Sequence, residues 1–216
     1  MDTGLTLAQF RTGLIFYFIF IASLCIREWA RAWTIDKLGD PNPAAQGRLT
    51  LNPIAHMDLF GSVIFPLVCI FFPASGIVFG WGKPVIPNPS YFSNPKRGEV
   101  IAALSGPVAN FLVAFGASVF FGFAHRISPA TEQLYANVLL VNIMLAVFNL
   151  VPLPPLDGGV LLKHLVGMSE ITFYRISQWS LLVWLAVIWL NPVQVAFITA
   201  MNLCSMPFEL IYRLIA

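Results

Sequence analysis

Long apolar stretches dominate this chain and constrain its fold more than any other feature. A hydrocarbon core about 30 Å thick requires about 20 apolar residues in a helix. Six stretches approach that length, at residues 12–33, 59–80, 100–124, 132–151, 174–190 and 193–215. The sequence therefore predicts an all-α, multi-pass integral membrane protein: a polytopic bundle of five or six transmembrane helices. The opening MDTGLTLAQF has no basic segment, so we expect the first stretch to be a retained span.

The composition agrees with a lipid environment. Of the 216 residues, 58% are hydrophobic and 10% are charged, whereas about 25% are charged in soluble domains. The formal net charge is only +2 and no basic stripe is present, so we expect no nucleic-acid partner. We expect a single domain over residues 1–216, surrounded by membrane lipid, in a bacterial-type inner membrane.

Two connecting stretches are rich in Pro, Asn and Gly, at residues 40–58 and 80–97. Within the first, GRLTLN alternates polar and apolar residues, which predicts a short strand. The prolines of the second predict an extended loop. We therefore expect short membrane-associated strands and loops between the spans. Further along, the Gly-Pro pair at 106–107 predicts a helix start, because Pro is tolerated in a first turn.

A third stretch, FNLVPLPPLDGG at residues 148–159, combines three prolines with one acid, Asp157. Prolines end or break a helix. Non-helical backbone at membrane depth is tolerated only where it is buried in protein or lines a water-filled cavity, and an acid beside it indicates a functional site. A solvated aspartate in an interfacial loop is the alternative, and these residues alone leave both open.

The first apolar stretch ends in REWARAW, which contains Arg27, Glu28 and Arg31. The two arginines are four residues apart and therefore share one helix face. Either they reach to the interface, with the neighbouring tryptophans in the aromatic belt, or they face the interior and pair with Asp157. These residues alone leave both arrangements open.

Four stretches, in order along the chain, resemble the site-2 protease family of intramembrane zinc metalloproteases. They are LGDPNPAAQGRLTLNPIAHMD, GWGKPVIPNPSYFSNPKR, ALSGPVAN and NIMLAVFNLVPLPPLDGG. They are similar to the family's Gly-Arg-Leu-Thr-Leu-Asn-Pro and His-x-Asp motifs, its Asn-Pro loop, its Gly-Pro-x-x-Asn helix start and the segment that carries its third metal ligand. The resemblance covers most of the chain and implies a site-2-protease-like core.

In that family the two histidines of His-Glu-x-x-His and a distant aspartate bind zinc, and the glutamate is the general base. The resemblance maps the aspartate to Asp157, the glutamate to Glu28 and the two histidines to Arg27 and Arg31. Arginine is a donor only and stays protonated, so it offers no lone pair to a metal. None of the chain's three histidines has a spacing that would replace the missing ligands.

This departure predicts a family member without zinc and without protease activity, that is, a pseudoprotease. A zinc ion with two carboxylates sums to zero charge, and so do two arginines with two carboxylates. We therefore expect Arg27 and Arg31 to take the place of the cation and to pair with Glu28 and Asp157.

Asn110, Asn142 and Asn149 lie within predicted helices. An amide in such a place is commonly an interhelical hydrogen-bond anchor. In the family, such asparagines line the substrate region, so the resemblance implies a peptide groove at these positions.

The resemblance implies a non-catalytic scaffold, a helix-binding regulator or an accessory subunit of a larger membrane complex, with transmembrane helices of another protein as its partner. An active intramembrane zinc metalloprotease with atypical ligands is the alternative. A second alternative is an ion or proton pathway through the arginine–aspartate cluster.

Overall fold

The computed structural model describes residues 7–71, 80–188 and 190–216, and the regular elements in them are helices. Four long helices form the body: α1 (Leu7–Lys37), α4 (Pro95–Ile127), α5 (Glu132–Leu150) and α8 (Asn191–Ile215). The remaining α-helices are α2 (Asn42–Ala45), α3 (Phe65–Phe71), α6 (Asp157–Val166) and α7 (Glu170–Ile188). The expected all-α architecture is therefore confirmed.

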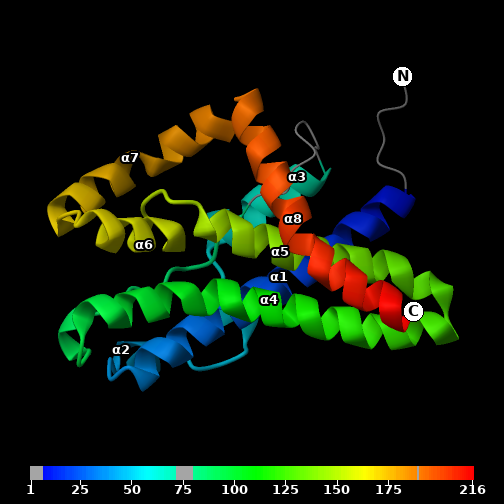
Figure 1. The fold of residues 1–216 in the computed structure, drawn as a ribbon, viewed down its shortest axis with the longest axis horizontal. Coiled ribbons are helices and arrows are strands. Elements are labelled where there is room, and N and C mark those ends of the chain that lie inside the picture. The colour runs from blue at the N-terminus through cyan, green and yellow to red at the C-terminus, as the bar shows by residue number, and fades with distance from the viewer. Residues whose placement is uncertain (1–6, 72–79, 189) are drawn as a thin grey trace.

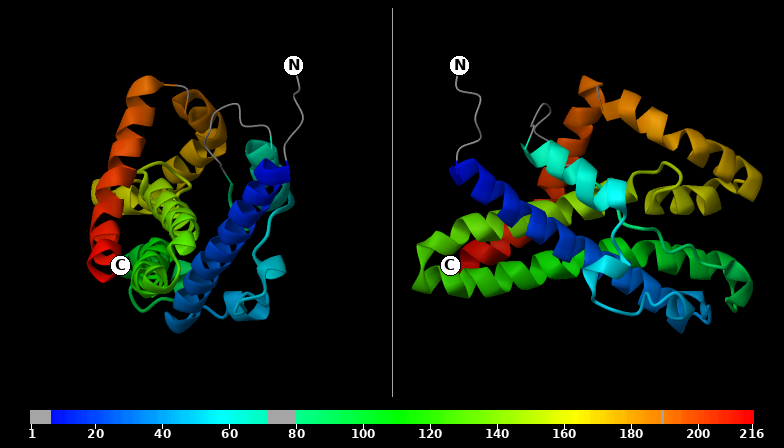
Figure 2. Two further views of the ribbon diagram at one scale, coloured as in Figure 1. Left: turned by 90° about the vertical axis from the view of Figure 1, so that its right-hand side faces the viewer. Right: turned by 180° about the vertical axis from the view of Figure 1, so that it is seen from behind.

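Helix α4 lies at the centre of the bundle (Figure 1). It runs antiparallel to α5, with α1 along one side and α8 along the other (Figure 2). One apolar cluster joins α4, α5 and α8 around Tyr135, Ile143 and Tyr212. A second joins α1 to α5 around Phe20 and Val141. Helices α6 and α7 lie beyond the end of α5, and α7 rises away from α4 before the chain returns as α8 (Figures 1 and 2).

Four stretches within the described residues are long and apolar enough to cross a membrane. They are Leu7–Lys37, Pro95–Ile127, Pro129–Leu150 and Asn191–Ile215. The chain is thus an integral, multi-pass membrane protein. The two other predicted spans, 59–80 and 174–190, include residues 72–79 and 189, which lie outside the described residues. The described part of the first contains a shorter apolar helix, Leu59–Ile70.

The predicted short strand at GRLTLN is wrong, because no strand occurs among the described residues. Hydrogen bonds to nearby side chains satisfy backbone amides here, in place of the hydrogen bonds between paired strands. Thr50 Oγ1 accepts from the Asn52 amide at 3.1 Å, and Asn52 Oδ1 accepts from the Ile54 amide at 3.1 Å. Such side-chain-to-backbone bonds compete with sheet formation. An isolated bridge between Met57 and Gly82 joins the two polar loops instead.

The predicted helix start at Gly106-Pro107 is also wrong, since both residues lie inside α4. The helix begins at Pro95, where the Asn94 side chain accepts from the Arg97 amide at 3.1 Å. This cap satisfies one of the free amides of the first turn. Gly106 has a packing role instead, because a Cβ there would lie 3.1 Å from Arg27 Cγ.

A cluster of charged side chains holds α6 against α4 and the start of α7. Lys163 Nζ donates to Glu99 Oε2 at 2.5 Å and to Glu170 Oε1 at 2.8 Å, and His164 Nε2 lies 2.6 Å from the same Glu99 oxygen. Burial opposes the charge on Lys163, but the hydrogen bonds and charges of Glu170 and Glu99 outweigh it, so the pKa of Lys163 is raised. The cluster therefore holds α6 in place through charged hydrogen bonds.

The break between α5 and α6 falls at the proline-rich stretch, as predicted. Helix α5 ends at Leu150 and α6 begins at Asp157. The return is so tight that a Cβ on Gly158 would lie 2.1 Å from the Leu150 carbonyl oxygen and 2.4 Å from that of Val151. A backbone contact of this kind cannot yield by a side-chain rotation, so the position requires glycine.

We predict that Gly158→Ala lowers the free energy of unfolding by about 1–3 kcal/mol, because the added methyl must push two backbone segments apart. Thermal melting of the purified protein in detergent measures the change. Gly116→Ala is the matched control, since a Cβ there meets no atom within 4 Å and adds about 0.5–1 kcal/mol of helix stability. Equal melting temperatures for the two variants would contradict the tight return.

Candidate functional site

The site lies where α1 meets the start of α6. One face of α1 carries Arg27, Glu28 and Arg31 toward the interior, and α6 begins with Asp157. Arg27, Glu28 and Asp157 are 7%, 3% and 2% exposed, and the side chain of Arg31 is 14% exposed. These four residues, called the arginine–carboxylate centre below, are thus inside the protein and not at its surface.

Two guanidinium groups bind one aspartate. Arg27 Nη2 donates to Asp157 Oδ2 at 2.6 Å, and Arg31 Nη1 donates to Asp157 Oδ1. Arg27 Nη1 also donates to Glu28 Oε1, and Arg31 Nε donates to the Val85 carbonyl oxygen at 3.1 Å. The inward arrangement and its ion pairs, which we expected, are therefore confirmed.

The charges of the centre balance, with two guanidinium groups against two carboxylates. An unpaired arginine at the centre of a membrane helix costs about 2.5–3.5 kcal/mol on insertion scales. Pairing with carboxylates through charge-assisted hydrogen bonds offsets that cost. The charges of the centre are therefore paired, while Arg27 Nε has no hydrogen-bond partner among the described residues. Removing one member leaves a buried charge without its partner.

Two glycines let other elements approach the centre closely, and sequence reasoning did not assign them that role. A Cβ on Gly106 of α4 would lie 3.3 Å from Arg27 Nε, and one on Gly82 would lie 3.1 Å from Glu28 Cγ. The motifs that contain them, GWGKP and SGP, were visible in the sequence. That these glycines pack against Arg27 and Glu28 follows only from the tertiary structure.

The residues of the centre do not fit a zinc ion. Zinc needs lone-pair donors such as neutral imidazole, thiolate or carboxylate, and guanidinium supplies only N–H donors. Both oxygens of Asp157 already accept from arginine. Across residues 7–71, 80–188 and 190–216, no group of three or more His, Cys, Asp or Glu side chains could hold a metal ion.

The three histidines make contacts away from the arginine–carboxylate centre. His56 Nε2 lies 2.7 Å from the Thr50 carbonyl oxygen, and His125 Nδ1 lies 2.9 Å from the Tyr212 hydroxyl. His164 belongs to the Lys163 cluster described above. None of the three therefore supplies an imidazole to Asp157 in this structure.

The three asparagines are buried in the bundle. Asn110 Nδ2 donates to Asn142 Oδ1 at 2.9 Å, and Asn142 Nδ2 donates to Ser23 Oγ at 3.0 Å. The side chains of Asn110 and Asn142 thus tie α1, α4 and α5 together one helical turn from Arg27. Asn149 Nδ2 bonds within its own helix, to the Leu145 carbonyl oxygen at 2.7 Å. The anchoring role of the first two is confirmed, and a peptide groove at these positions stays a prediction.

We predict that Asp157→Ala lowers the free energy of unfolding by about 3–5 kcal/mol, because it leaves Arg27 and Arg31 without that counter-charge in a buried place. Thermal or denaturant unfolding in detergent measures it. Glu170→Ala is the control, since this carboxylate also pairs with a cation but its side chain is 76% exposed; it should cost less than about 1 kcal/mol. A melting temperature that Asp157→Ala leaves unchanged would contradict a buried, closed centre.

Comparison with known proteins agrees with the resemblance drawn from the motifs. The model of the peptidase family M50 matches residues 124–191. YwhC of Bacillus subtilis, named as a candidate zinc metalloprotease, is 34% identical over 154 residues, which are 68% of this chain and 66% of that protein. Rip2 of Mycolicibacterium smegmatis, named in the same way, is 28% identical over 168 residues, 76% of this chain and 62% of that protein.

A shorter match, 32% identical over 73 residues, covers 34% of this chain and 21% of the zinc metalloprotease MJ0392 of Methanocaldococcus jannaschii. The chain thus spans slightly less than two thirds of the length of the first two relatives. No solved structure matches the chain at a significant level. On the motifs, the membrane helices and these relatives, the chain belongs to the peptidase family M50, the site-2 proteases.

Proposed function

We propose that this chain is a non-catalytic member of its family, acting as a scaffold, a helix-binding regulator or an accessory subunit of a larger membrane complex. The observation that carries the proposal is the pair of guanidinium groups on Asp157, one on each carboxylate oxygen. A residue that would be the third zinc ligand thereby already binds one cation of the protein itself on each of its oxygens.

The electrostatics of the centre support this role. Zinc with Glu28 and Asp157 would sum to zero charge, and the two arginines with the same carboxylates give the same sum. A zinc ion would instead add two positive charges beside two guanidinium groups, at a site buried from water, where repulsion between like charges is weakly screened. The centre therefore holds α1 and α6 together with no metal in it.

An active zinc metalloprotease with atypical ligands is the second candidate, and the names of the relatives favour it. It requires zinc, a lone-pair ligand set and a water activated by Glu28. Metal content therefore distinguishes the two candidates without knowledge of a substrate.

We predict that the purified chain contains no stoichiometric zinc, and that the double variant R27H/R31H gains close to one zinc per chain. The variant restores two imidazoles, four residues apart on one helix face, opposite Asp157. Elemental analysis by mass spectrometry after dialysis gives zinc per chain for both proteins. The triple variant R27H/R31H/D157N is the control and should bind zinc much more weakly. Near-stoichiometric zinc in the unaltered chain would overturn the proposal and favour the metalloprotease.

We further predict that the chain, extracted from its native membrane in mild detergent, migrates on a native gel as an assembly larger than one 23.9 kDa chain in its detergent micelle. A scaffold or subunit is bound to another protein, whereas a protein that acts alone is not. The chain expressed alone in a foreign membrane is the control for self-association. Migration as a single chain from both membranes would contradict the scaffold and subunit roles.

A further inference from the structure

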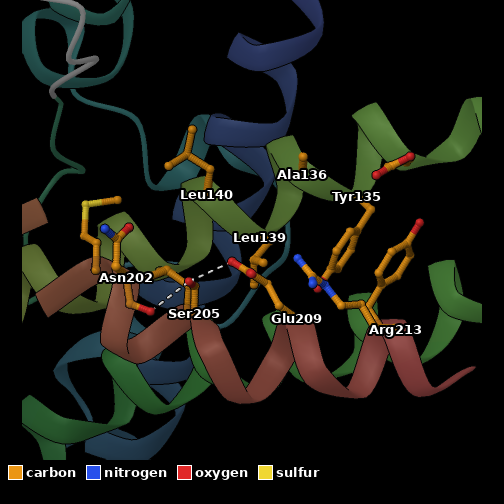
Figure 3. A pocket seen from close by; sticks show the side chains of 12 residues that line it. Tyr135, Ala136, Leu139, Leu140, Asn202, Ser205, Glu209 and Arg213 are labelled. Carbon is orange, nitrogen blue, oxygen red and sulfur yellow. Dashed lines mark hydrogen bonds between the residues drawn. The ribbon is translucent and has the colours of Figure 1, made fainter. Parts of the chain in front are cut away.

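A groove runs between α5 and α8, on the side of the bundle away from the arginine–carboxylate centre. Its volume is about 280 Å³. Figure 3 shows Leu139 on α5 next to Ser205 and Glu209 on α8, and Leu140 also lines the groove. Nothing in the proposed function uses this groove, and no residue of the centre lines it.

The groove has a rigid floor. The rings of Tyr135 and Tyr212 stack with their centroids 4.1 Å apart. Tyr135 donates to the Phe208 carbonyl oxygen at 3.1 Å, and the Tyr212 hydroxyl lies 2.9 Å from His125 Nδ1. These contacts fix α8 against α4 and α5, so the groove is formed before any ligand enters it. A preformed site loses little conformational entropy on binding.

The two ends of the groove differ in polarity. Glu132 is the first residue of α5, and Arg213 lies in the last turn of α8. Both therefore lie at the end of the bundle where α4 turns into α5, which is the end of three membrane-length helices (Figure 1). The other end is lined mainly by apolar side chains, Leu140, Ile143 and Met201, with the Asn202 amide beside them. The charged side chains thus lie at the end of the groove nearer the helix termini.

The charged side chains at the polar end of the groove can form further hydrogen bonds. Ser205 Oγ donates to Glu209 Oε1 at 2.9 Å. Within the part of the chain that the structure describes, Glu132, Glu209 and Arg213 form no ion pair. A carboxylate accepts about four hydrogen bonds and a guanidinium donates five. The polar end thus presents two carboxylates and one guanidinium to a ligand.

The groove is small for a ligand site, since its volume lies near the lower limit of about 300 Å³ for small-molecule sites. It therefore suits one alkyl chain with a small polar head group.

We propose that the groove binds one aminophospholipid of the phosphatidylethanolamine class. Its primary ammonium donates to Glu209 and Glu132, its phosphate accepts from Arg213, and one acyl chain lies along Leu140, Ile143 and Met201. Guanidinium binds phosphate through two parallel hydrogen bonds, and a primary ammonium has the N–H donors that carboxylates need. A choline head has no N–H donor, and an anionic glycerol head meets an excess of carboxylates.

The test uses the whole chain in a neutral detergent, titrated with dioleoyl phosphatidylethanolamine, phosphatidylcholine or phosphatidylglycerol. Native mass spectrometry counts the lipids that stay bound. We expect one phosphatidylethanolamine per chain, bound at least about tenfold more tightly than either other lipid. Equal binding of phosphatidylcholine, or tightest binding of phosphatidylglycerol, would overturn the proposal. This comparison needs no variant, so it stands even if a variant fails to fold.

Variants locate the site. Glu209→Gln should reduce the preference for phosphatidylethanolamine over phosphatidylcholine to about one, because the amide keeps the shape and the Ser205 contact but loses the charge. Arg213→Gln should weaken both lipids about tenfold. Arg126→Gln is the matched control, since Arg126 lies at the same end of the bundle but does not line the groove. Unchanged lipid preference in Glu209→Gln, or loss of binding in Arg126→Gln, would overturn the assignment to this groove.

Discussion

The contact of Arg27 and Arg31 with Asp157 is the interaction on which the rest of this structure depends. It joins α1 to α6 across 126 and 130 residues of chain. A charge within the hydrocarbon core needs a partner inside the protein, because acyl chains offer none. The short return between α5 and α6, the glycine at 158 and the Lys163 contacts with Glu99 all hold Asp157 where it meets the two arginines.

Polar contacts set the helix positions throughout the bundle. Lipid tails are as apolar as leucine, so the hydrophobic effect gives little preference for one helix arrangement over another. Here Ser23, Asn110 and Asn142 link α1, α4 and α5, and Glu99 links α4 to α6. These contacts lie on both sides of the arginine–carboxylate centre and keep its side chains at bonding distance.

The charges of the arginine–carboxylate centre balance, and its ion pairs join α1 to α6. Under the proposed function these ion pairs, and not a metal ion, hold the two helices together. The groove between α5 and α8 lies apart from the centre and has its own charged groups, Glu132, Glu209 and Arg213. The binding of lipid there and the role of the centre are therefore independent properties.

The sequence by itself determined the membrane class and the break before Asp157, because apolar length and proline act locally. The pairing of Asp157 with two arginines was expected from the family resemblance, since the residues alone left the interfacial alternative open. Only the tertiary structure decided that GRLTLN forms no strand, that Gly106 packs on Arg27 inside α4, and that a groove opens between α5 and α8. Each of these depends on which distant backbone lies within contact distance. Local patterns carry no record of that, since the same glycine or alternation occurs in helices, loops and strands alike.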